Sequence, residues 1–198
     1  GAYLSLQHVP VGEFTAILML VPLTVTLLAA MLLRERVGPV NWLLVAGGLT
    51  GALVVVRPKG SDFSLWLLLP LLLVVLNALY QIVTSHMVKS EDAGTTHFYT
   101  GVVGLTLSSA LLPWVWTPLR DPLLWALLAL MGVFGSLGHY LLIRAYHQAP
   151  ASRLAPYMYT QIAFATLGGW IVFGHAPDGW TVAGIGLIAL CGVLGVRL

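Results

Sequence analysis

Four polar residues stand inside one long apolar stretch near the middle of the chain: Asn77, Tyr80, Gln81 and Thr84. Spacings of three and four residues put them on one face of a helix. Because buried polar groups need partners, this stripe predicts a face that lines a wet cavity or meets a polar partner. The alternative is a set of hydrogen bonds between helices, each worth about 0.6 kcal/mol in a membrane.

A second polar group follows a proline in the last third of the chain. Tyr157, Thr160 and Gln161 again share one helix face, and Pro156 frees a backbone carbonyl and loosens the helix. Two interpretations stay open. These residues line the same cavity, or the tyrosine belongs to the belt of aromatic side chains at the membrane surface.

The two groups together predict a substrate site. Amides offer both donors and acceptors, and tyrosines add a flat apolar face with a hydroxyl. No unpaired carboxylate or lysine lies at midspan, so the site suits a neutral or zwitterionic, partly aromatic solute. The predicted binding residues are Asn77, Tyr80, Gln81, Tyr157 and Gln161.

A third polar group contains Ser136, His139, Tyr140 and Arg144, and His139 is the one histidine clearly inside a predicted span. Its imidazole is either a proton relay, since its pKa lies near neutrality, or a neutral partner of a neighbouring helix. Ser136 and His139 also have dyad spacing, yet the string Gly-Ser-Leu-Gly-His lacks the usual intramembrane serine-enzyme pattern. An intramembrane enzyme is therefore the weakest alternative.

Several other chemistries find no support in the sequence. The remaining histidines occupy turns or helix ends, and their spacing makes no metal site. The single cysteine, Cys191, excludes an intrachain disulfide and a cysteine metal cluster. There is no P-loop, so ATP is not the direct driver, and no cofactor is implied. Nine Lys and Arg residues, dispersed between apolar runs, do not form a patch for nucleic acid.

Composition indicates which class of protein positions these residues. The 198 residues are 59% hydrophobic and only 8% charged, with a mean hydropathy of +0.92, whereas soluble domains carry roughly a quarter charged residues. We therefore expect an all-α, polytopic helical bundle in a lipid bilayer. The expected elements are a stub at residues 1–8 and seven spans at about 12–33, 38–57, 63–88, 95–116, 122–147, 151–173 and 179–197.

The chain contains a degenerate internal repeat. A shift of 140 residues superposes the hairpin at 10–58 on the end of the chain, and the matched landmarks are Pro10 with Pro150, Glu35 with His175, and Arg57 with Arg197. Three helices separate the copies. Because three is odd, the copies are inverted relative to each other, as in many secondary transporters. Gly47 and Gly51 in the first copy indicate close helix packing.

Basic residues predict the orientation. One set of loops holds six: Arg34, Arg36, Lys89, Arg144, Arg153 and Arg197. The other set holds three: Arg57, Lys59 and Arg120. The positive-inside rule places the first set and the C-terminus in the cytoplasm, with a bacterial inner membrane as the expected location.

The hairpin with Arg-Glu-Arg-Val-Gly-Pro at its turn, Leu-Val-Ala-Gly-Gly-Leu-Thr-Gly after it and Arg57-Pro58 at its end resembles the EamA-type repeat of the drug/metabolite transporter superfamily. So does the stretch from Ile143-Arg144-Ala145-Tyr146 to Ala155-Pro156-Tyr157. The resemblance implies ten helices in two inverted five-helix repeats. Residues 1–58 then form the C-terminal part of an N-terminally truncated first repeat, and residues 63–198 form the second.

The amino-acid sequence of the second repeat also resembles those of bacterial metabolite or vitamin permeases, including riboflavin-type ones. One departure is His175, where such repeats often carry glutamate, so no role of that glutamate is carried over. We expect a secondary transporter of a small organic solute, such as a metabolite, vitamin, amino acid or drug, working by alternating access. A membrane scaffold without transport is the alternative. The sequence leaves the coupling ion, a proton among the candidates, and the oligomeric state open.

Overall fold

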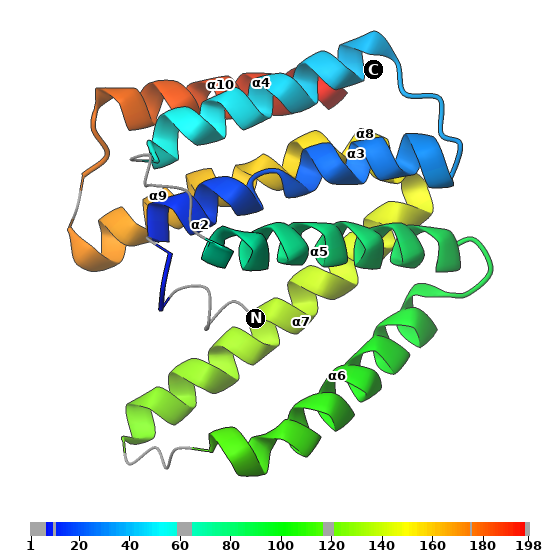
Figure 1. Cartoon of the computed structure of the whole chain (residues 1–198), viewed down its shortest axis with the longest axis vertical. Helices are drawn as coiled ribbons and strands as arrows, with labels where there is room; N and C mark the ends of the chain where they lie inside the picture. The colour runs from blue at the N-terminus through cyan, green and yellow to red at the C-terminus, as the bar shows by residue number, and fades with distance from the viewer. Residues whose placement is uncertain (1–6, 10, 59–64, 117–120, 175, 197–198) are drawn as a thin grey trace. The chain divides into compact units, whose positions relative to one another are not determined.

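The computed structural model describes residues 7–9, 11–58, 65–116, 121–174 and 176–196, and these ranges contain helices and no strand. The predicted all-α, polytopic architecture is confirmed (Figure 1). The elements are α2 (Val11–Leu18), α3 (Val21–Leu32), α4 (Pro39–Val56), η1 (Leu65–Leu67), α5 (Leu68–Met87), α6 (Ala93–Val115), α7 (Pro122–Gln148), α8 (Ala151–Leu154), η2 (Ala155–Tyr159), α9 (Thr160–Phe173) and α10 (Gly179–Val196).

Some predicted features lie outside the described residues. They are most of the N-terminal stub and the landmarks Pro10, Lys59, Arg120, His175 and Arg197. Within the described part, a helix occurs at each of the seven predicted spans. Four stretches are long and apolar enough to cross a membrane: Glu13–Leu32, Pro39–Val56, Leu65–Met87 and Pro122–Gln148. A shorter apolar helix covers Gly179–Gly195.

The first predicted span is interrupted, which corrects the single helix expected at 12–33. Helix α2 ends at Leu18, and α3 begins at Val21. Pro22 explains the break, because its ring conflicts with the carbonyl of the residue four positions earlier, which is Leu18. The N–H of Leu20 turns back to the carbonyl of Ile17 at 3.0 Å, so the chain makes a tighter turn before α3 starts.

The chain divides into two compact units. Unit 1 comprises Gly1–Val83 and Pro150–Leu198, and unit 2 comprises Thr84–Ala149. In unit 1, helices α4 and α10 lie side by side (Figure 1). A methyl group added at Gly51 would lie 2.8 Å from the backbone oxygen of Gly184, and one added at Gly184 would lie 2.7 Å from the backbone oxygen of Gly51. The two glycines therefore bring the helix backbones into direct contact.

The α4–α10 pair is antiparallel and follows the repeat. Leu44, near the start of α4, lies 3.5 Å from a methyl position on Gly195, near the end of α10. Val55, near the end of α4, lies 2.7 Å from a methyl position on Gly184. The 140-residue shift converts Leu44 into Gly184 and Val55 into Gly195. One contact is thus the image of the other, as two inverted copies require.

An ion pair joins the end of α4 to the start of α10. Arg57 has φ 43°, in the left-handed region, and its Nη2 lies 2.5 Å from Oδ1 of Asp178. The same carboxylate oxygen accepts the backbone N–H of Thr181 at 2.9 Å. These hydrogen bonds hold the pKa of Asp178 well below its usual range, and the bond from Arg57 has the largest effect. In turn, the bond to Asp178 raises the pKa of Arg57.

This ion pair predicts a pH dependence of stability. Because the pKa of Asp178 is lower in the folded state than its ordinary value of 3.8, the pair stabilises the fold above that value and loses its effect as pH falls below it. We expect the melting temperature of the purified protein to fall between about pH 4 and pH 2. Asp178→Asn should flatten part of that fall. Since both side chains are about half exposed, the difference should be small and should shrink in high salt. Identical profiles for both proteins at low salt would contradict the prediction.

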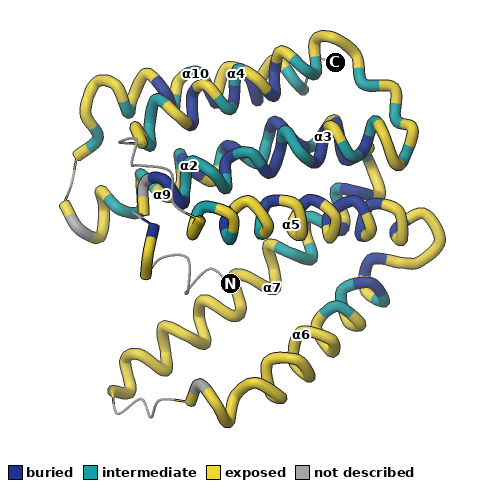
Figure 2. The backbone as a smooth tube through the Cα atoms, viewed as in Figure 1, coloured by how far each residue is buried: buried dark blue, intermediate teal, exposed yellow. Residues whose placement is uncertain are grey.

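Unit 2 is a helical hairpin whose two helices are capped by aspartates. Asp92 accepts the backbone N–H groups of Gly94 and Thr95 and the hydroxyl of Thr95, which lowers its pKa. Asp121 accepts the N–H of Leu123 at 2.8 Å. All residues at 101–114 and 121–138 are exposed (Figure 2). These apolar surfaces are available to lipid or to further helices.

Candidate functional site

The turn after α3 directs a carboxylate onto the start of α8. Arg34 has φ 54°, in the left-handed region, and the N–H groups of Leu33 and Glu35 both return to the carbonyl of Ala29, at 3.1 and 3.2 Å. This closing geometry is typical of helix C-termini. It reverses the chain and orients Glu35 toward the second repeat.

Glu35 is half-buried and caps α8. Its carboxylate accepts the N–H of Ala151 at 3.3 Å, the N–H of Ser152 at 3.1 Å and the hydroxyl of Ser152 at 2.6 Å. The first N–H groups of a helix have no partner within it, and a negative charge suits this end of the helix dipole. The carboxylate therefore ties the turn of the first hairpin to the second repeat.

A second bond at this junction follows from Pro156. A proline cannot donate to the carbonyl four residues earlier, which here belongs to Ser152. Nδ2 of Asn41 donates to that carbonyl at 2.5 Å. The freed carbonyl expected from the sequence is thus satisfied by α4, and the helix around Pro156 tightens into η2.

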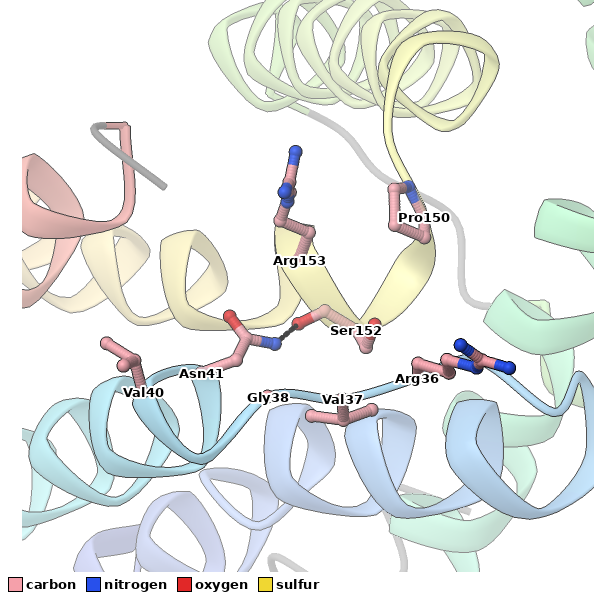
Figure 3. Close-up of a pocket in the computed structure, with 8 residues that line it drawn as sticks. All are labelled: Arg36, Val37, Gly38, Val40, Asn41, Pro150, Ser152 and Arg153. Carbon is pink, nitrogen blue, oxygen red and sulfur yellow. Dashed lines mark hydrogen bonds between the residues drawn. The ribbon is translucent and has the colours of Figure 1, made fainter.

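A basic pocket of about 540 Å³ lies between this turn, α4 and α8 (Figure 3). Arg36 lines it from the turn, Arg153 from α8, and Val40 and Asn41 from α4, and in Figure 3 the ends of the two arginine side chains point in different directions. None of its lining residues is acidic: they are Arg36, Val37, Gly38, Val40, Asn41, Pro150, Ser152 and Arg153.

A smaller cavity of about 370 Å³ in unit 1 is mainly apolar and includes one carboxylate. Glu13, which is 8% exposed, lines it together with Leu20 of the α2–α3 turn and Leu53 of α4. Glu13 lies in the first turn of α2.

The structure brings two of the predicted substrate residues together. Nε2 of Gln81 donates to Oδ1 of Asn77 at 2.6 Å, one turn apart on α5. Gln81 is buried, whereas Asn77 and Tyr80 are exposed. The polar stripe thus lies at the edge of the buried face of α5, with the Gln81 amide buried and the Asn77 amide exposed.

The other predicted substrate residues lie on η2 and α9. Tyr157 is half-buried, and its ring lies beside α10: a methyl group at Gly195 would come within 3.0 Å of its hydroxyl. Gln161 is exposed. That Asn77, Tyr80 and Gln81 face Tyr157 and Gln161 across one cavity stays a prediction.

Unit 2 holds a polar cluster that the sequence identified only in part. Nε2 of His97 on α6 lies 3.0 Å from Oγ of Ser136 on α7. The His97 ring is 5.6 Å from that of His139 and 5.5 Å, edge-on, from that of Tyr140. Nδ1 of His97 is buried with no hydrogen-bond partner among the described residues. Arg144 donates to the Tyr140 hydroxyl at 3.5 Å. The hydrogen bond between His97 and Ser136 links α6 to α7 within this cluster.

His97, Glu35 and Asn41 are the site residues that sequence reasoning missed. His97 lies near a helix end as expected, as the fifth residue of α6, but its contact with Ser136 of α7 was not predicted. Its signal was the polar spacing of Thr96, His97 and Thr100 on one helix face. Glu35 was a repeat landmark, and only the fold shows what it bonds.

The chain is similar to known proteins over most of its length. A family model described as the EamA-like transporter family matches residues 64–198. A "Riboflavin transporter" of Brucella anthropi is 31% identical over 181 residues, covering 88% of this chain and 63% of that protein. An "S-adenosylmethionine uptake transporter" of Rickettsia bellii is 28% identical over 185 residues, covering 93% of this chain and 63% of the relative.

Two further comparisons bear on direction and fold. A "Pseudopaline exporter CntI" of Pseudomonas aeruginosa is 28% identical over 193 residues, covering 95% of this chain and 66% of that protein. A crystal structure of another protein matches with a TM-score of 0.83 at 17% identity, covering 98% of this chain and 71% of that chain, and shows the same fold. The chain spans 61–63% of the length of the riboflavin transporters that it matches.

Proposed function

The chain belongs to the EamA-like transporter family, and from that premise we propose that it forms most of a secondary transporter for a small organic solute. Residues 63–198 are the second repeat in this proposal, and residues 1–58 are the C-terminal part of the first. The family match to residues 64–198 supports the former boundary. The protein is a multi-pass membrane protein, and the C-terminus is cytoplasmic in the proposed orientation.

The observation that carries the proposal is the reciprocal packing of α4 and α10. Inverted repeats related by a two-fold axis in the membrane plane allow one structure to open to either side by exchanging the conformations of its halves. The image contacts Leu44–Gly195 and Val55–Gly184 are what such a relation produces. A scaffold without transport has no need of this symmetry.

The proposed substrate is neutral or zwitterionic and partly aromatic. The amides of Asn77 and Gln81 and the ring and hydroxyl of Tyr157 supply the matching contacts, with Tyr80 and Gln161 completing the set. Riboflavin is the first compound to test, because several relatives carry that name. Relatives named for uptake and for export both occur, so the direction is left to experiment.

Transport by the full-length protein in liposomes tests the function. The panel should contain riboflavin, S-adenosylmethionine, amino acids and cationic drugs, each with and without a proton gradient. Saturable uptake of one class supports a transporter. No uptake of any class by correctly inserted protein would favour the scaffold. Stimulation by the gradient would support a coupling proton, with His139 as the proposed relay.

Two site variants should weaken substrate binding. Gln81→Ala removes an amide, and Tyr157→Phe removes a hydroxyl while keeping the ring beside α10. Losing one neutral hydrogen bond to the substrate costs about 0.5–1.5 kcal/mol, which raises the apparent dissociation constant roughly two- to tenfold. The measurement is substrate-dependent stabilisation or transport across a concentration series.

Trp125→Ala is the control for these variants. Trp125 lies in the first turn of α7 at an interfacial position and is 47% exposed, so its loss should change affinity little. If both site variants keep wild-type affinity, the substrate site lies elsewhere. The cluster of Ser136, His139 and Tyr140 would then become the first place to test.

A further inference from the structure

We infer that the junction between Glu35 and α8 is a gate, which closes one end of the protein and breaks when that end opens. The inference rests on the proposed transport function and adds to it the bonds that hold one of the two states. Those bonds are the three that the Glu35 carboxylate accepts from Ala151 and Ser152, together with the bond from Asn41 to the carbonyl of Ser152 (Figure 3).

The internal repeat separates the contacts that stay from those that are exchanged. Adding 140 to the bounds of α4, 39–56, gives 179–196, which are the bounds of α10. The packing of α4 on α10 is therefore its own image, and an exchange of conformations between the two halves leaves it in place. The contact between α3 and α8 has a different image, because the same shift pairs α3 with part of α9, and α8 with part of α2.

The structure contains one member of this second pair of contacts. Helix α3 packs against α8 and η2 (Figure 1). Among the described residues, α2 packs against α4, α9 packs against α10 and η2, and α2 and α9 share no comparable contact. The contact at the Glu35 end is therefore made without its image at the opposite end.

The burial of equivalent side chains shows the same asymmetry. Val25 and Thr26 of α3 are fully buried, at 0% exposure. Their counterparts on α9 are Ala165, which is exposed, and Thr166, which is half-buried. Because Thr26 and Thr166 are the same residue type, the difference reflects the packing around them. A transporter with inverted repeats produces such a difference between equivalent faces when one end is closed and the other is open.

The bonds of the junction suit a gate because water can replace them. Glu35 is half-buried, and its neighbours Arg34 and Arg36 are exposed. When the junction opens, water becomes the partner of the carboxylate and of the N–H groups of α8. An exchange of hydrogen bonds with water changes the free energy modestly, so the closed state is favoured and the opening is reversible.

Cross-linking of the junction tests the gate. In a cysteine-free background of the full-length protein, which includes Cys191→Ser, the pair Arg36→Cys/Arg153→Cys places one thiol on each side of the junction. Both positions are exposed and line the same pocket. A bifunctional reagent that forms disulfides should stop transport in liposomes, and a reductant should restore it, because the linked junction cannot open. Full transport by the cross-linked protein would overturn the inference.

The matched control pair is Arg57→Cys/Asp178→Cys, which replaces the ion pair between α4 and α10. This helix pair is its own image, so the same reagent should leave transport unchanged. Equal losses in both pairs would contradict the gate, because any link within unit 1 would then block the protein. Absence of transport before cross-linking would instead count against the proposed function, and the distances described next would still decide on the gate.

Distances between spin labels measure the opening without any solute. Labels on Arg36→Cys/Arg153→Cys should report mainly one short distance when Glu35 is present. Glu35→Gln keeps the length of the side chain but replaces one acceptor oxygen with a donor, so it should raise the ratio of open to closed protein about tenfold and add a longer distance. Glu91→Gln, which changes an exposed carboxylate outside the junction, should leave the distances unchanged. Identical distances with Glu35 and with Glu35→Gln would show that the junction is not a gate.

Discussion

Gly184→Val is expected to reduce the free energy of unfolding by about 1–3 kcal/mol, the usual cost of overpacking. A Cβ at this position would lie 2.7 Å from the backbone oxygen of Gly51 and 2.7 Å from a methyl group of Val55. A side chain can rotate away, but the backbone of α4 cannot move without disturbing its packing against α10 along the whole helix. Thermal unfolding in mild detergent, followed by size-exclusion chromatography at increasing temperature, measures the loss.

Gly186→Val is the matched control, because it lies two residues further on the same helix with no atom within 4 Å of its Cβ position. Valine replaces glycine at both sites, so any change in helix propensity is shared, and the difference isolates the contact with α4. Equal melting temperatures for the two variants would show that α4 and α10 are not in backbone contact in the membrane-inserted protein. The structure also predicts that Gly51→Val resembles Gly184→Val, since the two contacts are reciprocal.

The repeat was identified from the sequence, but the packing of the last helices of its two copies against each other was not predicted. The 140-residue shift paired the last helix of each repeat, and the odd number of helices between them required the copies to be inverted. The repeat pattern could not predict which glycines would be in contact. Gly47 and Gly51 matched the small-residue motif, yet Gly48 is the residue packed most tightly, against the ring of Tyr159. The motif sets the spacing of small residues, whereas the rotation of each helix depends on all its neighbours.

The structural effect of one proline was predicted from the sequence, and that of another was not. The sequence foresaw that Pro156 frees a carbonyl, and the structure shows η2 at that point. It did not foresee that Pro22 ends α2, although the same conflict with the residue four positions earlier was available there. The identity of the donor, Asn41, was out of reach, because 111 residues separate it from Ser152.

The predicted substrate residues illustrate the limit of helix periodicity. Periodicity placed Asn77 and Gln81 on one face, and they are hydrogen-bonded to each other. It could not tell which of them is buried, because burial depends on how the helix is rotated against its neighbours. His97 was missed for the related reason that its partners, Ser136 and His139, belong to another helix.

Glu35→Ala is the second variant for which we expect a large effect. The carboxylate accepts three hydrogen bonds from α8, and hydrogen bonds to charged groups contribute roughly 1.5–3 kcal/mol. Removing it leaves the N–H groups of Ala151 and Ser152 without an acceptor at a helix start, where a lost cap costs about 0.5–2 kcal/mol. We therefore expect the free energy of unfolding to fall by about 1.5–3 kcal/mol, measured by thermal unfolding in detergent.

Two comparisons separate this capping role from a general effect of charge. Glu91→Ala removes an exposed carboxylate from the turn between α5 and α6 and should change stability little. Ser152→Ala removes only the 2.6 Å bond and leaves the two backbone bonds, so its cost should be smaller than that of Glu35→Ala. In the double variant the costs should not add, because residues in one hydrogen-bond network are coupled by about 0.5–3 kcal/mol. Additive costs would mean that Glu35 and Ser152 stabilise the protein independently, and the turn of the first repeat would then not be what fixes the start of α8.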